Sequence, residues 1–598
     1  MSNKRTISVV AALMVALFLA NPHKSLAQAG DTLVVYANGP SIDEVISADT
    51  TNSGMQAHQV YKLVSRDTTY LWLGPITVKS NFEVIGVLGS DGRPPCIQAG
   101  VLTDGSLPYY LFVLNGAHTV ATFKNLYLTG RAPNNTINAS NVNGIGSFIQ
   151  VSADSVKLYV DNVIFEDMPN EAIGYTGNYD DFFITNCKFR NLISATEWYS
   201  GEGLRNASDL AKADTIIMDD NTFMAVNCYD VCPIWFTNYL QFDHNTDIFS
   251  FTGPPLGIWE ITDAKIDNNM FYGSWCGGIT YLEYIQFWNE VHSLAISSII
   301  DLDTLTETQA KVFDPADSSN PNLLWLAEAK RTIEVKNNNY FMPDTVLGFW
   351  KAYDDTAHGN DSLMFPTWMN DRTAHMFNDP TQWPGFVQSG NTFVDPGFGP
   401  SIDNMLYPNE GDGVGIFKYF MDIRGNTAST DVYGYQIQNV TGTNWIPQWP
   451  LPELQDMQYS NGSLKTGGTD GKPVGDMGWF SGGYTGVVKT PAQVPNKFTL
   501  YNAYPNPFNP STTIKVSLAH SGMASLKIYN VLGQLVRVVD QGFKEPGEYV
   551  YNVNMDNLSS GVYFYRLEQG SQMMTKKMML LMLISSESCT IFRGKLHS

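Results

Sequence analysis

Residues 184–189 read ITNCKF, a pattern in which an apolar residue, one or two Asn or Asp, a spacer and a large apolar residue follow one another. The same pattern recurs as FKNLYL (123–128), VDNVIF (160–165), MDDNTF (218–223), IDNNMF (266–271), VKNNNYF (335–341) and QSGNTF (388–393). A unit that recurs along a long chain indicates a repeat architecture, in which each copy stacks on the one before it.

Aligned on their final apolar residue, the copies share one residue type three places earlier. That position holds Asn, Asp or Gly, at Asn125, Asn162, Asn186, Asp220, Asn268, Asn338 and Gly390. These residue types tolerate a left-handed backbone, so we expect the same sharp turn in each coil. The final Phe or Leu then points inward, and the Asn side chains form a ladder of hydrogen bonds between coils.

This pattern resembles the asparagine-ladder turn of right-handed parallel β-helices of the pectate-lyase-like superfamily. The copies are 37, 24, 34, 48, 70 and 52 residues apart. The spacing of 48 corresponds to two coils, with a weaker copy at residues 243–249, and the longer spacings imply inserted loops. We therefore predict an all-β chain with a right-handed parallel β-helix, its N-terminal cap and inserted loops over residues 28–400. The alternative is a β-sandwich or propeller whose hairpins share one turn chemistry.

The first residues have the features of a signal peptide. Lys4 and Arg5 precede an apolar run at residues 7–20, and small residues precede an expected cleavage after Ala27. The run is 14 residues long, whereas a membrane-spanning helix needs about 20. We assign residues 1–27 to the signal peptide and expect no membrane span in the mature chain.

The C-terminal part changes in character after about residue 490. Short alternating strands with Gly, Pro and Asn turns predict a small immunoglobulin-like β-sandwich over residues 491–581. Its motifs YPNPFNPSTTI (504–514), IYNVLGQLV (528–536), LSSGVYFYRL (558–567) and TKKMMLL (575–581) closely resemble the type A C-terminal sorting domain of the type IX secretion system of Bacteroidetes and relatives. The resemblance implies export to the cell surface or medium, with the translocon of that system as partner. Residues 401–490 are expected to be an irregular packing segment and linker, and 582–598 an atypical tail.

Charge and cysteine content exclude several classes of function. Residues 28–496 contain 23 basic and 52 acidic residues, a net charge of −29, whereas residues 497–581 contain 8 and 5. A body this acidic argues against nucleic acid as partner, because binding phosphates needs clustered Lys and Arg. The six cysteines are too few for a disulfide scaffold. Cys228 and Cys232 could close a small loop, but we favour buried free thiols.

The resemblance to pectate-lyase-like proteins raises the question of catalysis. Lyases of this kind hold Ca²⁺ with acidic side chains and abstract a proton with Arg or Lys. The acids with a shared register, and hence the metal candidates, are Asp161, Asp219 and Asp267; the base candidates are Lys188, Arg190 and Arg205. The motif order of the related hydrolases is absent, because Asp219-Asp220 precedes Asn245-Thr246-Asp247 and no GHG or RIK follows. Each acid could instead simply cap a turn.

A second class of function is non-catalytic. Exposed aromatic rings stack on sugars, and the tryptophans in or beside the proposed coils are Trp198, Trp235, Trp259, Trp275, Trp288 and Trp325. Some of them must instead fill the interiors of the coils, and the sequence leaves open which. We therefore predict an exported cell-surface or secreted protein that is glycan-binding, adhesive or structural. The alternative is a polysaccharide lyase or glycoside hydrolase that acts on an acidic polysaccharide, with Ca²⁺ as the one cofactor considered.

Overall fold

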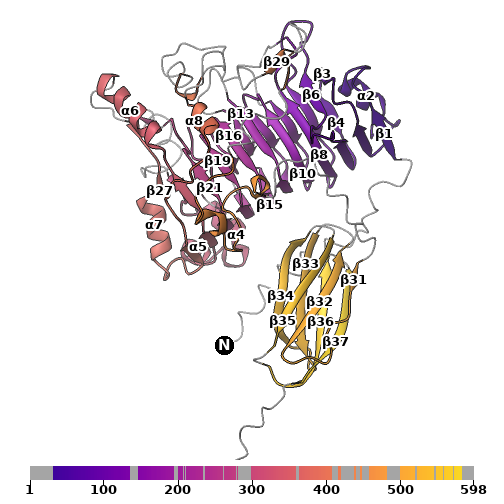
Figure 1. Ribbon diagram of the computed structural model, residues 1–598, viewed down its shortest axis with the longest axis vertical. Helices are drawn as coiled ribbons and strands as arrows, with labels where there is room; N and C mark the ends of the chain where they lie inside the picture. The colour runs from indigo at the N-terminus through magenta and orange to yellow at the C-terminus, as the bar shows by residue number, and fades with distance from the viewer. Residues whose placement is uncertain are drawn as a thin grey trace, which may run out of the picture. The chain divides into compact units, whose positions relative to one another are not determined.

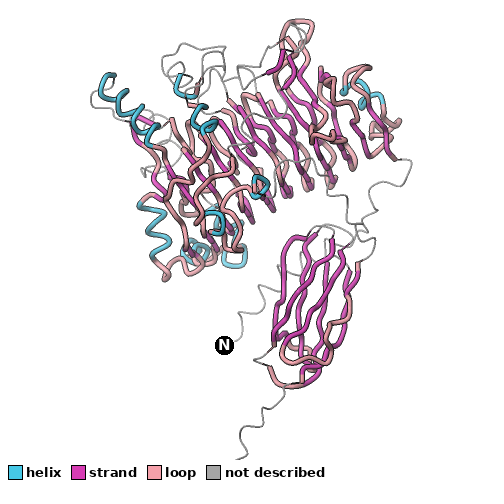
Figure 2. Tube along the Cα trace, in the orientation of Figure 1, coloured by secondary structure: helices cyan, strands magenta, loops and turns pink. Residues whose placement is uncertain are grey.

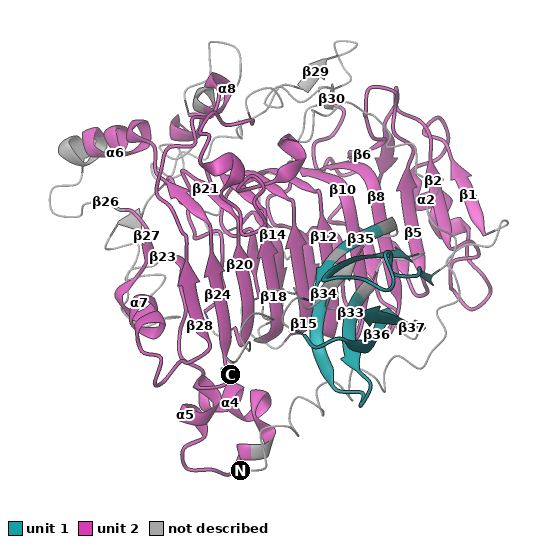
Figure 3. Ribbon diagram, turned by 60° about the horizontal axis from the view of Figure 1, so that its bottom comes forward, with its two compact units in different colours: residues 1–26, 487–598 teal, residues 27–486 magenta. Residues whose placement is uncertain are grey.

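The computed structural model places two compact units, residues 27–486 and a second unit that contains residues 487–598 (Figures 1 and 3). The described residues are 31–134, 146–193, 200–206, 208, 211–233, 236–259, 261–277, 279–280, 298–357, 363–406, 415–418, 437–439, 445–447, 457–480, 498–518, 522–544, 547–555, 558–569 and 572–581. The signal-peptide residues, the 582–598 tail and much of 401–490 lie outside these ranges, so the expectations for them stay predictions.

The body is a parallel β-helix with three faces. Face 1 consists of β1 (Thr32–Val35), β2 (Val60–Leu63), β5 (Phe82–Gly86), the first halves of β8 (Val120–Thr129) and β10 (Lys157–Glu166), β12 (Asn178–Thr185), β15 (Lys212–Asp219), β18 (Phe236–Asp243), β20 (Asp263–Asp267), β24 (Thr332–Lys336) and β28 (Phe386–Ser389). Face 2 consists of β3 (Tyr70–Trp72), β6 (Cys96–Ala99), the second halves of β8 and β10, β13 (Lys188–Leu192), β16 (Thr222–Val226), β19 (Thr246–Ile248), β21 (Met270–Tyr272) and β25 (Asn339–Phe341). Face 3 consists of β4 (Ile76–Val78), β7 (Tyr110–Leu114), β9 (Ser147–Val151), β11 (Glu171–Tyr175), β14 (Glu202–Asn206) and β17 (Val231–Cys232).

Neighbouring strands on all three faces are parallel. Parallel pairing between consecutive coils confirms the predicted β-helix, because hairpins of a sandwich or propeller pair antiparallel.

The helices of the body gather, apart from α2, toward the coils of its C-terminal part (Figure 2). They are α2 (Ile42–Ala48), α4 (Glu307–Phe313), α5 (Leu323–Glu328), α6 (Asp344–Ala357), α7 (Asp371–Asn378) and α8 (Pro400–Asn404). The short strands β22 (Ile279–Thr280), β23 (Ser298–Ile300), β26 (Leu363–Met364), β27 (Thr367–Met369), β29 (Ile437–Asn439) and β30 (Trp445–Pro447) form two-stranded pairs outside the three faces.

From β8 onward, one residue per coil turns the chain from face 1 to face 2 with a positive φ. We call this set the turn row: Asn125, Asn162, Asn186, Asp220, His244, Asn268, Asn337 and Gly390. In the coil that contains β24, the positive φ falls on Asn337 (53°) and not on Asn338, the residue expected from the sequence. The sequence alignment matched Phe341 with Phe271, but the strand register pairs Phe271 with Tyr340, so the expected turn residue was one position too late in the chain.

Asn338 belongs to a second column, one residue after the turn row, which we call the inner ladder. Its members are Asn221, Asn245, Asn269, Asn338 and Asn391. The Oδ1 of each later member accepts the backbone N–H of the preceding member, as in Asn221 N to Asn245 Oδ1 at 3.0 Å, and the Oδ1 of Asn221 accepts the backbone N–H of Cys187. Each Nδ2 donates to a backbone carbonyl one coil earlier, as in Asn245 Nδ2 to Met218 O at 2.9 Å. The inner ladder thus supplies partners for the buried backbone groups that the turn removes from the β-sheets.

Large apolar side chains fill the interior between the faces. Phe165, Phe189 and Phe223 stack in one column, with ring centroids 4.9 Å and 4.6 Å apart. These spacings match the distance of about 4.8 Å between neighbouring strands. Five cysteines, Cys96, Cys187, Cys228, Cys232 and Cys276, are buried free thiols. The structure therefore agrees with free thiols at Cys228 and Cys232 and not with a disulfide between them.

The second unit contains a sandwich of two antiparallel sheets. One sheet consists of β31 (Thr499–Leu500), β32 (Ser511–Leu518) and β35 (Gly547–Asn554). The other consists of β34 (Leu535–Lys544), β33 (Gly522–Asn530), β36 (Gly561–Gln569) and β37 (Gln572–Leu580). Ile514, Val516, Leu526, Ile528 and Tyr565 are buried in the core between the two sheets. This architecture confirms the C-terminal β-sandwich.

Candidate functional site

The acids proposed as metal ligands do share a register on face 1. Pairing from β10 to β20 aligns Asp161, Thr185, Asp219, Asp243 and Asp267 in successive coils. Asp161 is separated from the other acids by Thr185, and its carboxylate already has three side-chain partners, one of which is the Thr185 hydroxyl at 3.3 Å. Its carboxylate pairs with Lys124 at 2.5 Å and accepts a hydrogen bond from Asn186 Nδ2 at 2.8 Å.

Asp219, Asp243 and Asp267 are adjacent acids on neighbouring strands. Burial raises the pKa of each, and repulsion from the neighbouring carboxylates adds to the effect; for Asp267 the pKa rises to about 7. Asp243 and Asp267 also accept hydrogen bonds from Asn268 Nδ2 and the Lys336 amide. Among the described residues, no three His, Cys, Asp or Glu side chains are grouped so as to hold a metal ion. The geometry therefore gives the predicted Ca²⁺ site no support.

Residues 457–480, which we call the strap, lie across the turn row of the middle coils. Its backbone bonds to three coils: Asp476 N to Thr246 Oγ1 at 2.8 Å, Thr469 N to Asn268 Oδ1 at 2.6 Å, and Met477 N to Asp220 Oδ1 at 3.0 Å. Asn337 Nδ2 donates to Gly467 O at 2.6 Å. The strap therefore uses turn-row side chains that would otherwise be open to a ligand.

The strap also covers Lys188, the first of the base candidates. The Lys188 Nζ lies 4.7 Å from the centre of the Trp479 ring, and the side chain is 4% exposed. Trp479 Nε1 in turn donates to Thr222 Oγ1 at 2.7 Å on the next strand. A substrate sugar could not reach Lys188 without displacement of the strap.

Arg190, the second base candidate, is part of a buried ion pair on face 2. Its Nη1 lies 2.8 Å from Glu166 Oε1, and Tyr127 donates its hydroxyl proton to the other carboxylate oxygen. Burial raises the pKa of Glu166 to about 7, although Arg190 opposes the shift. Arg190, Glu166 and Tyr127 are buried and bonded to one another, so this network holds neighbouring strands of the sheet together.

Arg205, the third candidate, lies beside two carboxylates on the outer side of face 3. Its Nη1 donates to both oxygens of Glu202, at 3.0 and 3.1 Å. Glu202 pairs in register with Glu171 on β11, and Gly174 lies between Arg205 on β14 and Gln150 on β9. We call Gln150, Glu171, Glu202 and Arg205 the face 3 cluster. Arg205 is the member that reaches solvent, with a side chain 30% exposed, whereas that of Glu202 is 1% exposed.

Gly174 makes room for the carboxyl group of Glu171. A Cβ at Gly174 would lie 2.5 Å from Glu171 Oε1 and 2.8 Å from Gln150 Oε1. Glu171 is 2% exposed, and its Oε1 has no hydrogen-bond partner among the described residues. A buried acceptor without a partner costs about 1–3 kcal/mol, so this atom is a place where a ligand donor would be favourable.

The two carboxyl groups of the face 3 cluster differ in their environment. Burial is the main cause that raises the pKa of Glu171, to about 8, and the negative charge of Glu202 adds to it. Burial also raises the pKa of Glu202, but the ion pair with Arg205 opposes that shift. At neutral pH we therefore expect Glu171 to be protonated and Glu202 to be the ionised partner of Arg205.

Sequence reasoning found Arg205 but missed Glu171, Glu202 and Gln150. The missed signal is a four-residue pattern on face 3 with a polar first residue, a small or apolar second, an apolar third, and a polar residue or Gly fourth. It occurs in SFIQ (147–150), EAIG (171–174) and EGLR (202–205). It has no turn residue with a positive φ, so an alignment on Asn and Phe passes over it.

The tryptophans expected to stack on sugars are only partly placed. Trp259 and Trp275 are 3% and 1% exposed, so they are among the tryptophans that are buried and cannot form an open platform. Trp325 is 51% exposed on α5, away from the face 3 cluster in sequence and strand register. Trp198, Trp235 and Trp288 lie outside the described residues.

A further acid lies inside the β-helix. Asp247 occupies the interior column between Phe223 and Phe271, where its Oδ2 accepts hydrogen bonds from Ser250 and Ser274. Burial raises the pKa of Asp247 to about 7. Burial also raises the pKa of Asp230, and the negative charge of Asp247 raises it further. The Asn-Thr-Asp sequence at 245–247 is thus a ladder and core element and not part of a catalytic motif.

We predict that Asp247→Asn stabilises the protein at alkaline pH. The folded-state pKa of about 7 exceeds the unfolded value of about 3.9, so the folded state holds the proton more tightly. The contribution of Asp247 to the free energy of unfolding should therefore fall as the pH rises from about 4 to 7, and it should stay constant above pH 7. Urea unfolding should show Asp247→Asn more stable than the wild type by on the order of 2 kcal/mol at pH 8, with the difference closing toward pH 4. Asp104→Asn, at an exposed carboxylate, is the control and should show no gain; an equal gain there would contradict the prediction.

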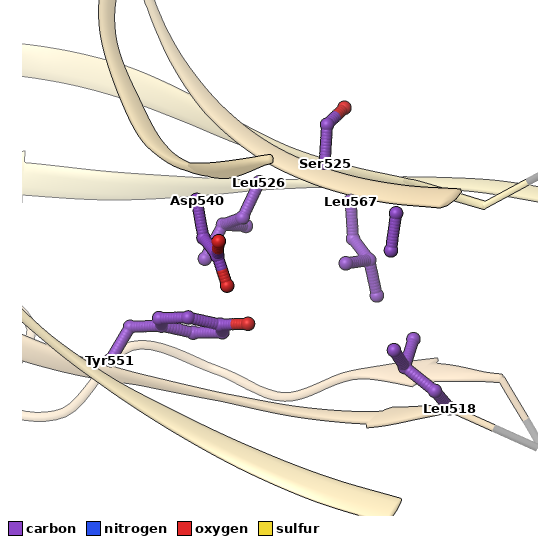
Figure 4. A pocket seen from close by; sticks show the side chains of 7 residues that line it. Leu518, Ser525, Leu526, Asp540, Tyr551 and Leu567 are labelled. Atoms are coloured by element: carbon purple, nitrogen blue, oxygen red, sulfur yellow. The ribbon is translucent and has the colours of Figure 1, made fainter. Parts of the chain in front are cut away.

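The sandwich contains a small gap between its two sheets (Figure 4). It is lined by Leu518, Ala524, Ser525, Leu526, Asp540, Tyr551 and Leu567. Asp540 and Tyr551 face this gap, whereas Ser525 points away from Tyr551. Burial and the hydrogen bond with Asp540 raise the pKa of Tyr551. The two polar groups satisfy one another between leucines, so we assign no ligand to this gap.

Residues 502–581 match the family model described as the secretion system C-terminal sorting domain. The match covers most of the sandwich and confirms the resemblance to the sorting domain of the type IX secretion system. A search of curated proteins found no match to the chain. In the part of the chain that the structure describes, no helix is long and apolar enough to cross a membrane.

The chain is thus a parallel β-helix protein that carries a sorting domain for export to the cell surface or the extracellular space. Its secretion machinery is the type IX system, with which the sorting domain interacts.

Proposed function

We propose that the body is an extracellular glycan-binding protein and that the face 3 cluster is its binding site. The observation that carries this proposal is Glu171 Oε1, a buried oxygen with no hydrogen-bond partner in the described part of the chain, beside the partly exposed Arg205. Sugar hydroxyls donate as well as accept, so they can satisfy Glu171 and Gln150 and also accept from Arg205 Nε, which has no hydrogen-bond partner within the described ranges. Binding sites of this kind place a few convergent polar groups on a rigid scaffold, and β9, β11 and β14 supply the scaffold.

The charge of the site favours neutral glycans over acidic ones. Arg205 is already neutralised by Glu202, and the body carries a net charge of −29. The carboxylate of a uronic acid would meet Glu202 and, on deprotonation, Glu171 at close range, and like charges in a buried site repel strongly. The face 3 cluster therefore supports neutral polysaccharide as the ligand class in place of the acidic polysaccharide first considered.

Gly174→Ala is expected to weaken glycan binding without unfolding the protein. The new Cβ would fall 2.5 Å from Glu171 Oε1, the far end of a flexible side chain, so the carboxyl group can move aside at little cost. Displacement of Glu171 and Gln150 removes two contacts, and we expect affinity to fall by roughly tenfold or more. Calorimetry with neutral xylan, mannan, β-glucan and galactan oligosaccharides measures the loss, and thermal unfolding checks the fold.

Gly462→Ala is the matched control, because a Cβ there meets nothing within 4 Å. It should bind as the wild type does. If the wild type binds none of these oligosaccharides, or if Gly174→Ala binds as tightly as the wild type, the site assignment is wrong, and a purely structural role for the β-helix becomes the better reading.

A further inference from the structure

We propose that the sandwich binds the secretion machinery through an apolar surface at one end of its four-stranded sheet. This surface, which we call the apolar end, consists of Val531, Leu532, Leu535, Phe564 and Met579. The inference goes beyond glycan binding, because it concerns the other unit of the chain, and neither proposal depends on the other.

The tip of the hairpin between β33 and β34 exposes two apolar side chains. Val531 is 65% exposed and Leu532 is 79% exposed. Other residues hold the turn itself. Asn530 Oδ1 accepts the backbone N–H groups of Leu532 and Gln534, both at 3.0 Å. Gly533 supplies a positive φ of 76°. Polar residues are usual at such a tip, so the fold does not explain Val531 and Leu532.

The outward side of the sheet continues this apolar surface. Leu535 on β34, Tyr529 on β33 and Phe564 on β36 are register partners in the sheet that contains the strands labelled β33, β34, β36 and β37 in Figure 1. Met579 on β37 lies two residues after Lys577, the partner of Phe564, so it projects from the same side. Leu535, Phe564 and Met579 are 51%, 37% and 39% exposed. The apolar end thus extends from the hairpin tip to the last strand of the sheet, and contiguous exposed apolar surface of this kind marks contact with another molecule.

Cations border the apolar end on the same side of the sheet. Lys527 and Arg566 are register partners on β33 and β36, and Lys577 lies on β37. Each lies two residues from an outward residue of its own strand, so all three project outward. Glu568 offsets one of these charges through its ion pair with Arg566 at 2.9 Å. Two copies of this surface would bring like charges together, whereas a partner with acidic groups around an apolar surface would be attracted.

The family match favours a protein of the secretion machinery over a lipid surface as that partner. Every residue of the apolar end lies within residues 502–581, the part that matches the sorting domain. Sorting has to separate exported chains from those that stay in the periplasm, and a lipid surface is the same for both. A protein surface of complementary shape and charge can make that distinction.

Leu532→Asp and Leu535→Asp in the full-length protein should each lower the exported fraction by roughly tenfold or more, because a charge inside an apolar contact is desolvated without a partner. The protein should accumulate in the periplasm of a host with a type IX secretion system, as cell fractionation measures. Leu532→Met, which keeps an apolar side chain, should be exported as the wild type is.

Met573→Asp is the matched control. Met573 is 61% exposed on β37 of the same sheet, six residues before Met579 and therefore about 20 Å from it. This variant should be exported as the wild type is. Thermal unfolding should give the same midpoint for the wild type and the three Asp variants, because all three positions are exposed.

A photoreactive amino acid tests the contact directly. Placed at position 532, it should form a crosslink to a component of the type IX translocon, identified by mass spectrometry. Placed at position 573, it should form none. This measurement decides the question even if an Asp variant fails to fold.

Each outcome supports or overturns the assignment. Wild-type export of both Leu532→Asp and Leu535→Asp overturns it, as does an equal loss of export in Met573→Asp or the absence of a translocon crosslink at position 532. If the wild type floats with anionic phospholipid vesicles and Leu532→Asp does not, a membrane is the occupant. If the wild type forms a dimer that Leu532→Asp dissociates, a second copy is the occupant. Either of these results overturns contact with the secretion machinery.

Discussion

Asn245→Leu should lower the free energy of unfolding of the body by about 3–5 kcal/mol. Leucine has nearly the shape of asparagine, so the change tests hydrogen bonding and not packing. It removes the acceptor of the Asn221 backbone N–H at 3.0 Å and the donor to Met218 O at 2.9 Å. Both backbone groups would stay buried without partners, at a cost of about 1–3 kcal/mol each, and the side-chain bonds to Asn221 and Asn269 are lost as well.

The midpoint of urea unfolding, followed by tryptophan fluorescence, measures this effect, and hydrogen exchange should show faster opening at the Asn221 amide. Asn238→Leu, on the preceding strand β18, is the matched control, because the Asn238 side chain is exposed and donates its Nδ2 to Asp214 Oδ1 at 2.8 Å. We expect a change there within about 0.5 kcal/mol. Equal effects at the two positions would show that the inner ladder contributes no special stability.

Removal of residues 497–598 should abolish delivery to the cell surface or medium in a host with a type IX secretion system. The reason is that residues 502–581 constitute the sorting domain that the secretion machinery recognises. We expect the truncated protein to accumulate in the periplasm, with a fall in the exported fraction to near zero. Cell fractionation and the accessibility of the protein to added protease on intact cells measure the distribution.

Two companion variants sharpen the export experiment. Removal of residues 582–598 alone tests whether the chain beyond β37 affects recognition, and export close to wild type is expected. Transfer of residues 497–581 to an unrelated periplasmic protein should export that protein. If the truncated body still reaches the surface, the sorting domain is not the signal for this chain.

The fold was largely predictable because its turns use a narrow set of residues. Asn125, Asn162 and Asn186 occupy the turn row because few other residues adopt a positive φ at low cost, so the same residue type recurs at each corner. The run of three asparagines at 337–339 defeated the alignment, since each of them could have been the turn. Only the strand register, which pairs Phe271 with Tyr340, assigns the turn to Asn337.

The candidate site was much harder to predict. Glu171 and Glu202 are 31 positions apart, and nothing in their local sequence says that they are register partners. Asp161, Asp219 and Asp267 were the natural choice because they recur beside the turn row, but Lys124 and Asn186 already bind the first of them. Lys188 was predicted without knowledge of the strap, which comes from a segment almost 300 residues later and places Trp479 over it.

The strap also decides how the protein bears mechanical load. Phe480 is the last described residue of the β-helix unit, and it follows hydrogen bonds that join the strap to Asp220, Thr246 and Asn268 in three successive coils. A pull on anything attached downstream is therefore applied to the flank of the middle coils and not to the last coil. Hydrogen bonds spread over several coils share such a force, whereas a tether at the final coil would peel the coils off one at a time. A surface protein held in this way would keep its β-helix intact under flow.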